Sequence, residues 1–282
     1  MTVRVILTDL DGTLLEPGGE ACEDVRSLLA ELSRRLIPVC PVSSKTAAEL
    51  RVIGRELALR APAGFENGAG VLDTDDTVEL DAAAVPLDRL VPLASRLRER
   101  TGAPLRTLFE LTDAELAAIT GLGGEALAAA RERRATLPLV VDPAWDDRLR
   151  AGLSAHPSLR LIRGNRFLHL QGTHDKAAAA GELAHRFRAR EGLTVACGDA
   201  PNDAGLLARA DVAVIIPGPA GPHPELLRRL PRARVAPHPH GRGWAAAVRE
   251  ILSEDPSPPR RKASPEDGNE DPPPGRRETP DG

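Results

Sequence analysis

The sequence of 282 residues predicts an α/β protein, with a mostly parallel sheet flanked by helices and a second, smaller unit of mixed strands and helices. A short apolar run at 3–8 contains no turn residue, as expected of a buried parallel strand. Further along, segments of helical periodicity alternate with apolar runs of strand length. Between about 84 and 174 the elements become shorter and more mixed, which predicts a separate α+β unit.

The elements of the larger unit follow from local patterns. After the first strand, apolar residues at Val25, Leu28 and Leu32 have helical spacing. The prolines in the next apolar run suggest an edge or strained strand. We therefore expect helices at 20–35, 47–59, 177–190, 204–210 and 243–252, and strands at 36–42, 71–72, 193–197 and 211–216.

The smaller unit is predicted in the same way. Thr112 and Glu115 have the spacing of a capping box, which marks the start of a helix. We expect helices at 85–100, 114–120, 124–136 and 145–155. We expect strands at 105–109, 137–141, 159–162 and 166–170, the last two forming a hairpin about Gly164 and Asn165.

Composition excludes several classes of protein. A hydrophobic content of 41% supports a core, but no apolar run approaches the roughly 20 residues that span a bilayer. The net charge of −4, with no basic stripe, argues against nucleic-acid binding. The three scattered cysteines resemble reduced core thiols, and acidic residues come too early for a signal peptide, so we expect a cytoplasmic protein. Residues 253–282 are rich in proline and charge and are expected to be disordered.

The first strand ends on two acids that carry the main functional prediction. Asp9 and Asp11 are followed at once by glycine and threonine. Ligands of open α/β sheets bind at the carboxyl ends of the strands, and two adjacent acids there favour a bound cation. Mg²⁺ suits oxygen ligands and a phosphate-bearing substrate. One acid can then attack phosphorus while the other transfers a proton to the leaving group. An ordinary Asp-Gly turn is the alternative.

Two further segments follow strands in the first part of the chain. Ser43, Ser44 and Lys45 lie between a strand and a helix, where a hydroxyl and free N–H groups can bind a phosphoryl oxygen. Helix capping alone would also explain them. Asn67 begins a glycine-rich turn, which read by itself is a hairpin turn.

Later motifs add a cation and a second set of acids. Lys176 precedes a clear helix and is one of only three lysines in the chain, so it is a candidate clamp for a phosphate. The strand at 193–197 is followed by Asp199, Asn202 and Asp203, which are candidate magnesium ligands. Arg166 and His169 lie on opposite faces of a strand. They are candidates for binding a substrate carboxylate and sugar.

The motifs Asp-Leu-Asp-Gly-Thr, Ser-Ser-Lys-Thr, Lys176 and Gly-Asp-Ala-Pro-Asn-Asp come in the order found in haloacid dehalogenase-like phosphatases. The chain resembles the Cof-type, cap-bearing members of that superfamily, and most of all the mannosyl-3-phosphoglycerate phosphatase family. The resemblance implies a doubly wound, mostly parallel Rossmann-like core sheet with an inserted small α+β cap domain. It divides the chain into a core (1–83 and 175–252), a cap (84–174) and a tail (253–282).

The resemblance also implies site roles and a substrate. It makes the first aspartate the nucleophile. Asp9, Asp11, Ser43 and Lys176 would be catalytic, and the ion would be held by Asp9, Asp11 through its backbone carbonyl, Asp199, Asn202 and Asp203. Substrate would be bound by Ser44, Lys45, Asn67, Arg133, Arg166 and His169. The implied activity is Mg²⁺-dependent hydrolysis of mannosyl-3-phosphoglycerate, a step in making the compatible solute mannosylglycerate.

One stretch departs from the family pattern and leaves the sugar open. At 133–138 the chain reads Arg-Arg-Ala-Thr-Leu-Pro, without the acidic and aromatic residues that the family often shows. The sugar could therefore be glucosyl. A broader sugar-phosphate phosphatase, a phosphomutase and a non-catalytic phosphosugar-binding regulator are the remaining alternatives. The partner expected is a small phosphorylated molecule, with no nucleic acid and no membrane, and nothing in the sequence indicates an oligomeric state.

Overall fold

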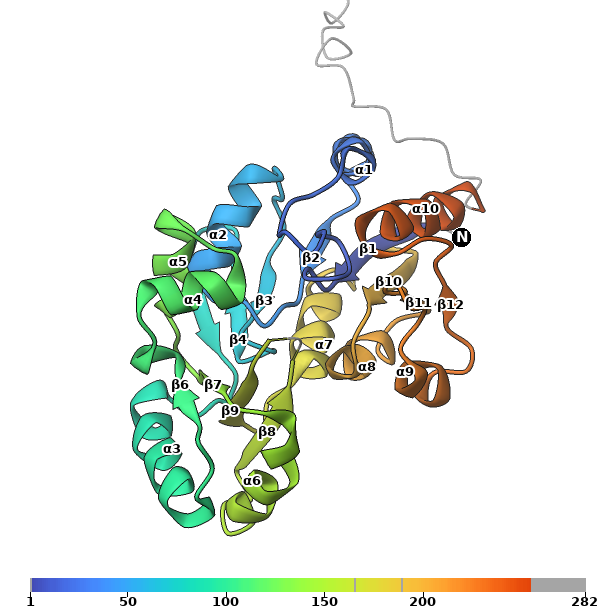
Figure 1. Ribbon diagram of the computed structural model, residues 1–282. Coiled ribbons are helices and arrows are strands. Elements are labelled where there is room, and N and C mark those ends of the chain that lie inside the picture. The colour runs from blue at the N-terminus through green and yellow to red at the C-terminus, as the bar shows by residue number, and fades with distance from the viewer. Residues whose placement is uncertain (1, 165, 189, 255–282) are drawn as a thin grey trace, which may run out of the picture.

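The computed structural model describes residues 2–164, 166–188 and 190–254 (Figure 1). Its central feature is a parallel sheet of five strands in the order β12-β11-β10-β1-β2. The strands are β1 (Val3–Thr8), β2 (Val39–Pro41), β10 (Leu193–Gly198), β11 (Val212–Ile215) and β12 (Arg234–Val235). In the middle of the sheet β1 pairs with β10, so that Val3 lies beside Leu193 and Thr8 beside Cys197.

Helices cover both faces of this core sheet. Side chains of β1 alternate between them, with Ile6 packed on one face and Val5 and Leu7 on the other. The first face is covered by α1 (Glu23–Arg34) and α10 (His240–Ser253), the second by α7 (Lys176–Arg186), α8 (Ala204–Leu207) and α9 (Pro224–Arg229). The predicted doubly wound α/β core is confirmed.

The segment after β2 leads from the core sheet to a smaller antiparallel sheet. Helix α2 (Ala47–Glu56) begins with a capping box between Thr46 and Glu49. A three-stranded sheet follows, built of β3 (Ala63–Phe65), β4 (Gly70–Leu72) and β5 (Val78–Leu80). A single parallel bridge between Val42 and Gly64 joins it to the edge of the core sheet.

The inserted unit is built on a four-stranded antiparallel sheet in the order β6-β7-β9-β8. Leu90 and Leu97 of one helix and Leu149 of another pack on its apolar face. The strands are β6 (Arg106–Thr107), β7 (Thr136–Val140), β8 (Leu159–Arg163) and β9 (Leu168–Gly172). The helices are α3 (Leu87–Thr101), α4 (Asp113–Thr120), α5 (Gly124–Arg131) and α6 (Asp146–Leu153), with short 3₁₀ turns at Leu108–Glu110 and Pro143–Trp145.

Most of the predicted elements are confirmed, and the differences concern short or terminal ones. Helix α5 ends at Arg131 rather than at 136, because β7 already begins at Thr136. Strands β3, β5 and β12 and helix α9 were not predicted, since two to six residues carry little periodicity. Asn165 of the predicted hairpin and residues 255–282 of the predicted tail lie outside the described residues.

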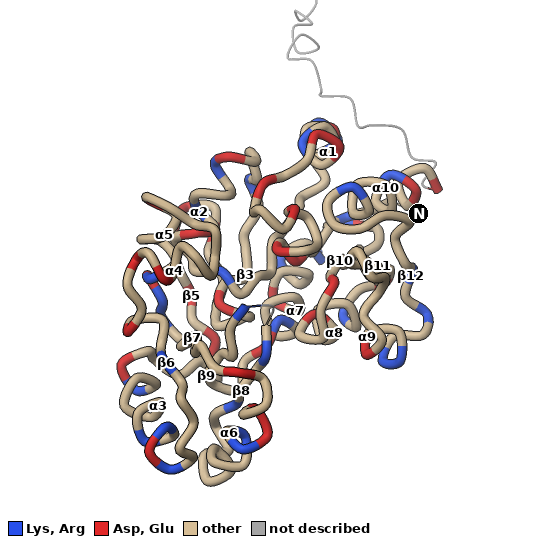
Figure 2. Tube along the Cα trace, in the orientation of Figure 1, with Lys and Arg blue, Asp and Glu red and all other residues tan. Residues whose placement is uncertain are grey.

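The surface agrees with the charge pattern of the sequence. Both basic and acidic residues lie on α3 and on α6 (Figure 2). Cys22, Cys40 and Cys197 are all free thiols. Among the described residues, no helix is both long and apolar enough to cross a bilayer.

The packing of α10 gives a stability prediction. Trp244 is fully buried between α1 and the core sheet, so Trp244→Ala leaves a large cavity and is expected to lower the free energy of unfolding by about 3–5 kcal/mol. Urea titrations followed by circular dichroism measure this change. Leu227→Ala on the exposed face of α9 is the control, and an equal loss in both variants would contradict the packing.

Candidate active site

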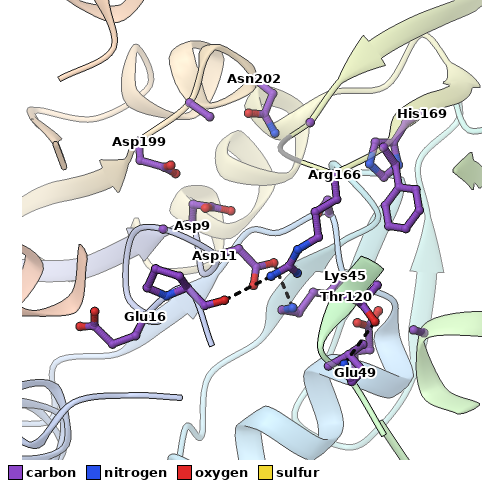
Figure 3. A pocket seen from close by; sticks show the side chains of 18 of the residues that line it. Asp9, Asp11, Glu16, Lys45, Glu49, Thr120, Arg166, His169, Asp199 and Asn202 are labelled. Atoms are coloured by element: carbon purple, nitrogen blue, oxygen red, sulfur yellow. Dashed lines mark hydrogen bonds and ion pairs between the residues drawn. The ribbon is translucent and has the colours of Figure 1, made fainter. Parts of the chain in front are cut away.

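The acidic motifs meet at the carboxyl end of the core sheet. Asp9 follows β1 directly, and its backbone N–H donates to the carbonyl of Cys197 at 2.9 Å. This contact places Asp9 beside the end of β10, where Asp199 follows Gly198. In Figure 3, Asp9, Asp11 and Asp199 lie near one another at the ends of these strands. The sequence prediction that these acids come together is therefore met by the geometry.

A buried lysine joins two of the acids. Lys176 is the first residue of α7, and its ammonium lies 2.5 Å from Oδ1 of Asp9 and 2.6 Å from Oδ1 of Asp203. All three side chains are buried. Burial alone would lower the pKa of Lys176, but the two carboxylates outweigh it and raise that pKa, so the ammonium stays charged.

Asp203 organises the loop that carries Asp199. Its Oδ2 accepts the N–H groups of Asp199 at 3.1 Å and Ala200 at 3.0 Å. Thr13 donates its hydroxyl to Oδ1 of Asp199 at 3.1 Å. Gly12 has a φ of +85°, and a Cβ there would lie 2.6 Å from Oδ2 of Asp199. The glycine of the first motif is thus required for the two motifs to approach.

The donor set fits a hard divalent cation. Carboxylate oxygens of Asp9, Asp199 and Asp203 lie within 4.8 Å of one another. Burial raises the pKa of Asp9, and burial together with the Asp203 carboxylate raises that of Asp199 to about 6. One ammonium among these acids leaves negative charge to be balanced. The buried Oδ1 of Asn202 also has no hydrogen-bond partner, so another oxygen ligand is available.

The second motif contributes Ser44 and the ammonium of Lys45 to the cavity surface, but not Ser43. The ammonium of Lys45 lies 2.9 Å from Oδ2 of Asp11. Burial lowers the pKa of Lys45, but Asp11 and Glu49 outweigh this and raise it. Ser43 is buried behind this contact, and its Oγ accepts the backbone N–H of Lys45 at 3.3 Å.

These side chains open onto a cavity of about 490 Å³ between the core sheet and the inserted unit (Figure 3). Its core side is polar, and the opposite wall, from the inserted unit, is largely apolar. The polar side includes Asp9, Asp11, Ser44, Lys45, Lys176, Asp199 and Asn202, and the opposite wall includes Leu108, Leu116, Leu122, Ala130, Phe167 and His169. Ser43, Asn67 and Asp203 lie outside the residues that line it.

The two predicted arginines differ in how far they are engaged. Nη1 of Arg133 donates to the carbonyl of Ser44 at 2.8 Å and to Oγ1 of Thr136 at 3.0 Å. Arg166 crosses the cavity and donates to the carbonyl of Pro17 at 3.2 Å (Figure 3). Arg133 thus ties the inserted unit to the core, whereas Arg166 spans the cavity with one such contact.

Two residues at the site were not singled out from the sequence. Glu66 is fully buried, and its carboxylate contacts the inserted unit. His240 begins α10, lines the cavity, and has Nδ1 3.2 Å from the carbonyl of Gly12. Neither lies in a motif with recognisable spacing. The positive φ of Glu66, like that of His240, appears only in the folded chain.

Comparison with known proteins agrees with this geometry. No family model matches the chain. A glucosyl-3-phosphoglycerate/mannosyl-3-phosphoglycerate phosphatase from Persephonella marina is 28% identical over 264 residues, covering 89% of this chain and 97% of the relative. A haloacid dehalogenase-like hydrolase from Bacteroides thetaiotaomicron superposes with a TM-score of 0.68 at 18% identity, covering 89% of this chain and 100% of that structure.

The chain has the haloacid dehalogenase-like fold. A second structure, the subclass IIB sugar phosphatase BT4131 of that superfamily, has a TM-score of 0.66 at 15% identity, covering 88% of this chain and 99% of its own. The resemblance predicted from the motifs is therefore confirmed.

Burial of His169 gives a pH prediction. Burial, with the nearby charges of Arg133, Arg163 and Lys176, lowers the pKa of His169 to about 3. An unfolded histidine titrates near about 6.5, so between these values only the unfolded chain binds the proton. His169 should therefore reduce stability as the pH falls below about 6.5, by up to about 1.4 kcal/mol per pH unit.

Urea unfolding at pH 7 and pH 5 tests this for the wild type and His169→Gln. We expect a smaller loss of stability in the variant between the two pH values. Equal losses would show that the imidazole titrates normally in the folded chain.

Proposed function

We propose that the chain is a phosphatase that hydrolyses a phosphorylated sugar derivative, with Asp9 as the nucleophile. The observation that carries this is the pairing of Asp9 with the buried ammonium of Lys176, beside Asp11, in one cavity. An ammonium at that place offsets the charge of the carboxylates and of an incoming phosphate. The relative from Persephonella marina and the sugar phosphatase BT4131 support this class of substrate.

In the proposed reaction a carboxylate oxygen of Asp9 attacks phosphorus, and the bond from phosphorus to the sugar-derivative oxygen breaks. Asp11 donates a proton to that departing oxygen. Water then attacks phosphorus of the aspartyl phosphate, Asp11 takes the proton of that water, and phosphate leaves with Asp9 restored. Lys176 would hold the phosphoryl oxygens in place during both steps, and Ser43, whose hydroxyl lies behind the cavity surface, would support the loop of Lys45.

We propose that Mg²⁺ is the cofactor. Asp9, the backbone carbonyl of Asp11 and Asp199 would hold it, with Asn202 as a further oxygen ligand. Asp203 would mainly position its neighbours and would not bind the ion directly, because its oxygens already accept hydrogen bonds from Lys176 and two backbone N–H groups. When bound, the ion would offset charge on the transferring phosphoryl group.

The inserted unit, residues 84–174, is proposed to be a substrate-specificity cap on a core of 1–83 and 175–252. The cavity lies between the two, so the part of the substrate beyond the phosphate would contact the cap wall. We propose that Arg166 binds a substrate carboxylate and His169 a sugar hydroxyl. Ser44, Lys45 and Arg133 would bind from the edge of the core. Asn67 would act indirectly, because it lies behind the cavity.

The substrate we favour is mannosyl-3-phosphoglycerate, with the glucosyl compound as the second candidate. Both names stand in the description of the relative from Persephonella marina. The product would then serve as a compatible solute, made in the cytoplasm, where free thiols such as Cys40 and Cys197 stay reduced.

The first test measures phosphate release from mannosyl-3-phosphoglycerate, glucosyl-3-phosphoglycerate and several hexose phosphates with Mg²⁺. We expect a strong preference for one glycosyl-phosphoglycerate, and a loss of at least about 10³-fold in kcat for Asp9→Asn, which removes the nucleophile. Equal weak activity on every compound would overturn the substrate. Full activity in the variant would overturn the nucleophile.

The metal proposal has its own test. Chelation with EDTA should abolish phosphate release, and added Mg²⁺ should restore it. Asp199→Ala should weaken Mg²⁺ binding by about 10–100-fold, measured by calorimetry, because it removes a carboxylate ligand. Asp211→Ala is the control. Asp211 directly precedes β11 and accepts the N–H of Thr194 in β10, at the end of these two strands that lies away from the site. Activity that persists in EDTA would contradict the proposal.

A further inference from the structure

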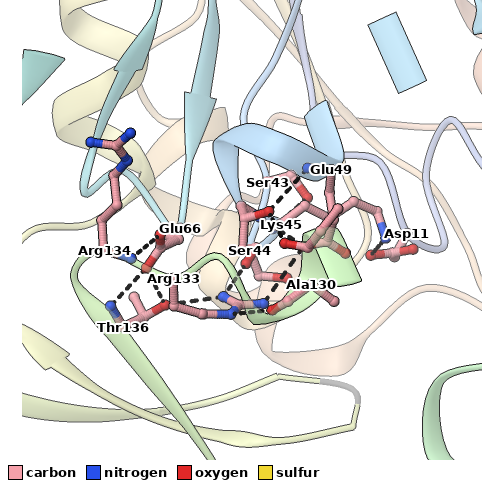
Figure 4. Close-up of polar contacts among 12 residues, drawn as sticks. Asp11, Ser43, Ser44, Lys45, Glu49, Glu66, Ala130, Arg133, Arg134 and Thr136 are labelled. Atoms are coloured by element: carbon pink, nitrogen blue, oxygen red, sulfur yellow. Dashed lines mark hydrogen bonds and ion pairs between the residues drawn. The ribbon is translucent and has the colours of Figure 1, made fainter. Parts of the chain in front are cut away.

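The buried carboxylate of Glu66 receives four hydrogen bonds from the cap. Its Oε1 accepts the N–H of Arg134 at 2.8 Å, and its Oε2 accepts the N–H groups of Ala135 at 3.0 Å and Thr136 at 2.7 Å. The hydroxyl of Thr136 adds a bond of 2.7 Å (Figure 4). Hydrogen bonds to an ionised carboxylate are about twice as strong as neutral ones, so this contact holds the start of β7 firmly.

The backbone of the same turn is hydrogen-bonded to the loop that carries Ser43 and Lys45. The N–H of Glu66 donates to the carbonyl of Lys45 at 2.8 Å, and that of Asn67 donates to the carbonyl of Ser43 at 2.8 Å. Glu66 has a φ of +48° and Asn67 a φ of +60°, so the chain turns sharply at these two residues. As a result, their backbone N–H groups bond to the core while the side chain of Glu66 bonds to the cap.

The turn also meets the second connection between cap and core. The side-chain amide of Asn67 donates to Oε1 of Gln171 at 3.0 Å, at the end of β9. A Cβ on Gly68 would lie 2.0 Å from the carbonyl of Asp175, the residue before Lys176. The three residues 66–68 therefore contact the cap, the loop of Lys45 and the start of the helix that carries Lys176.

Other contacts tie the same cap segment to the core. The hydroxyl of Thr46 donates to the carbonyl of Ala129 at 2.8 Å, and Arg133 donates to the carbonyl of Ser44. Glu66 differs from these because one side chain accepts from three successive residues at the start of β7. In the sheet β7 pairs with β9, which carries His169 into the cavity.

We infer that Glu66 is a positioning residue: its carboxylate sets the place of the cap's substrate-binding wall relative to Asp9. This rests on the proposed phosphatase function for its kinetic consequences. The phosphoryl site is built from core residues, so it does not depend on the carboxylate of Glu66. The site for the rest of the substrate does depend on it.

Glu66→Gln is the central variant, because it keeps the size of the side chain and replaces an acceptor oxygen with an NH₂ group facing N–H donors. Glu115→Gln is the matched control. Glu115 accepts the N–H of Thr112 at 2.8 Å and bonds with Arg106, but all these contacts lie within the cap. Thr136→Val removes a hydroxyl that donates to Glu66 and accepts from Arg133, and it is a milder test that preserves the carboxylate.

The first measurement is hydrogen exchange of peptides covering 134–136, which needs no substrate. In Glu66→Gln we expect these amides to exchange at least about tenfold faster, and in Glu115→Gln at the wild-type rate. Unchanged exchange in Glu66→Gln would overturn the inference. If that variant does not fold, Thr136→Val is compared with wild type, and faster exchange of the same amides is again expected.

The second measurement compares a cap-dependent substrate with a small one. For the preferred glycosyl-phosphoglycerate we expect Glu66→Gln to raise KM about tenfold with kcat within about twofold. For p-nitrophenyl phosphate both constants should stay within about twofold of wild type. Thr136→Val should raise KM in the same direction by about threefold.

The outcomes separate this inference from the proposed function. Equal losses on both substrates in Glu66→Gln would show a general structural role and overturn the inference. A wild-type chain inactive on both substrates would overturn the phosphatase function, while hydrogen exchange would still decide whether Glu66 holds the cap.

Discussion

The buried ammonium of Lys176, held between Asp9 and Asp203, is the contact on which the site is built. Burying a charge is costly unless it is paired, so the three side chains must be placed together. That requires the ends of β1 and β10 to be adjacent and α7 to begin at Lys176. It also requires close packing of the loop, since a Cβ on Gly198 would lie 2.5 Å from the Cβ of Asp203.

The cavity has two sides of different chemistry, and they come from different parts of the chain. The core side offers carboxylates and ammonium groups that suit a phosphoryl group and a cation. The cap side offers leucines and an aromatic ring, and its polar groups are Thr120, Arg133, Arg166 and the neutral His169. Recognition of the sugar portion would therefore depend on a few polar side chains within an apolar wall.

The sequence predicted the carboxylates of the core side well because Asp9, Asp11 and Asp199 come just after predicted strands. They could be placed at one edge because the carboxyl ends of parallel strands meet there. Lys176 stood out through the rarity of lysine. Short motifs carry these positions, and the fold brings the motifs together.

The remaining features depend on contacts between distant segments. Arg133 was predicted to bind substrate, but in the structure its guanidinium also donates to the carbonyl of Ser44, 89 residues away. Its predicted role remains untested. Glu66 accepts from residues 68 to 70 positions further along the chain, and no local pattern predicts such a contact. His240 approaches Gly12, which lies 228 positions earlier in the sequence.

The pairing of β1 with β10 has a consequence for how the protein is made. β1 occupies 3–8 and its central neighbour 193–198, so the ribosome must synthesise most of the chain before the two can meet. At roughly 5–20 residues per second, β1 waits on the order of ten seconds or more beside β2 alone. The inserted unit pairs only its own strands and can complete its sheet in that interval. Newly made chains would thus pass through a stage in which the cap is assembled but the core sheet is incomplete. At that stage the chain would depend most on chaperones.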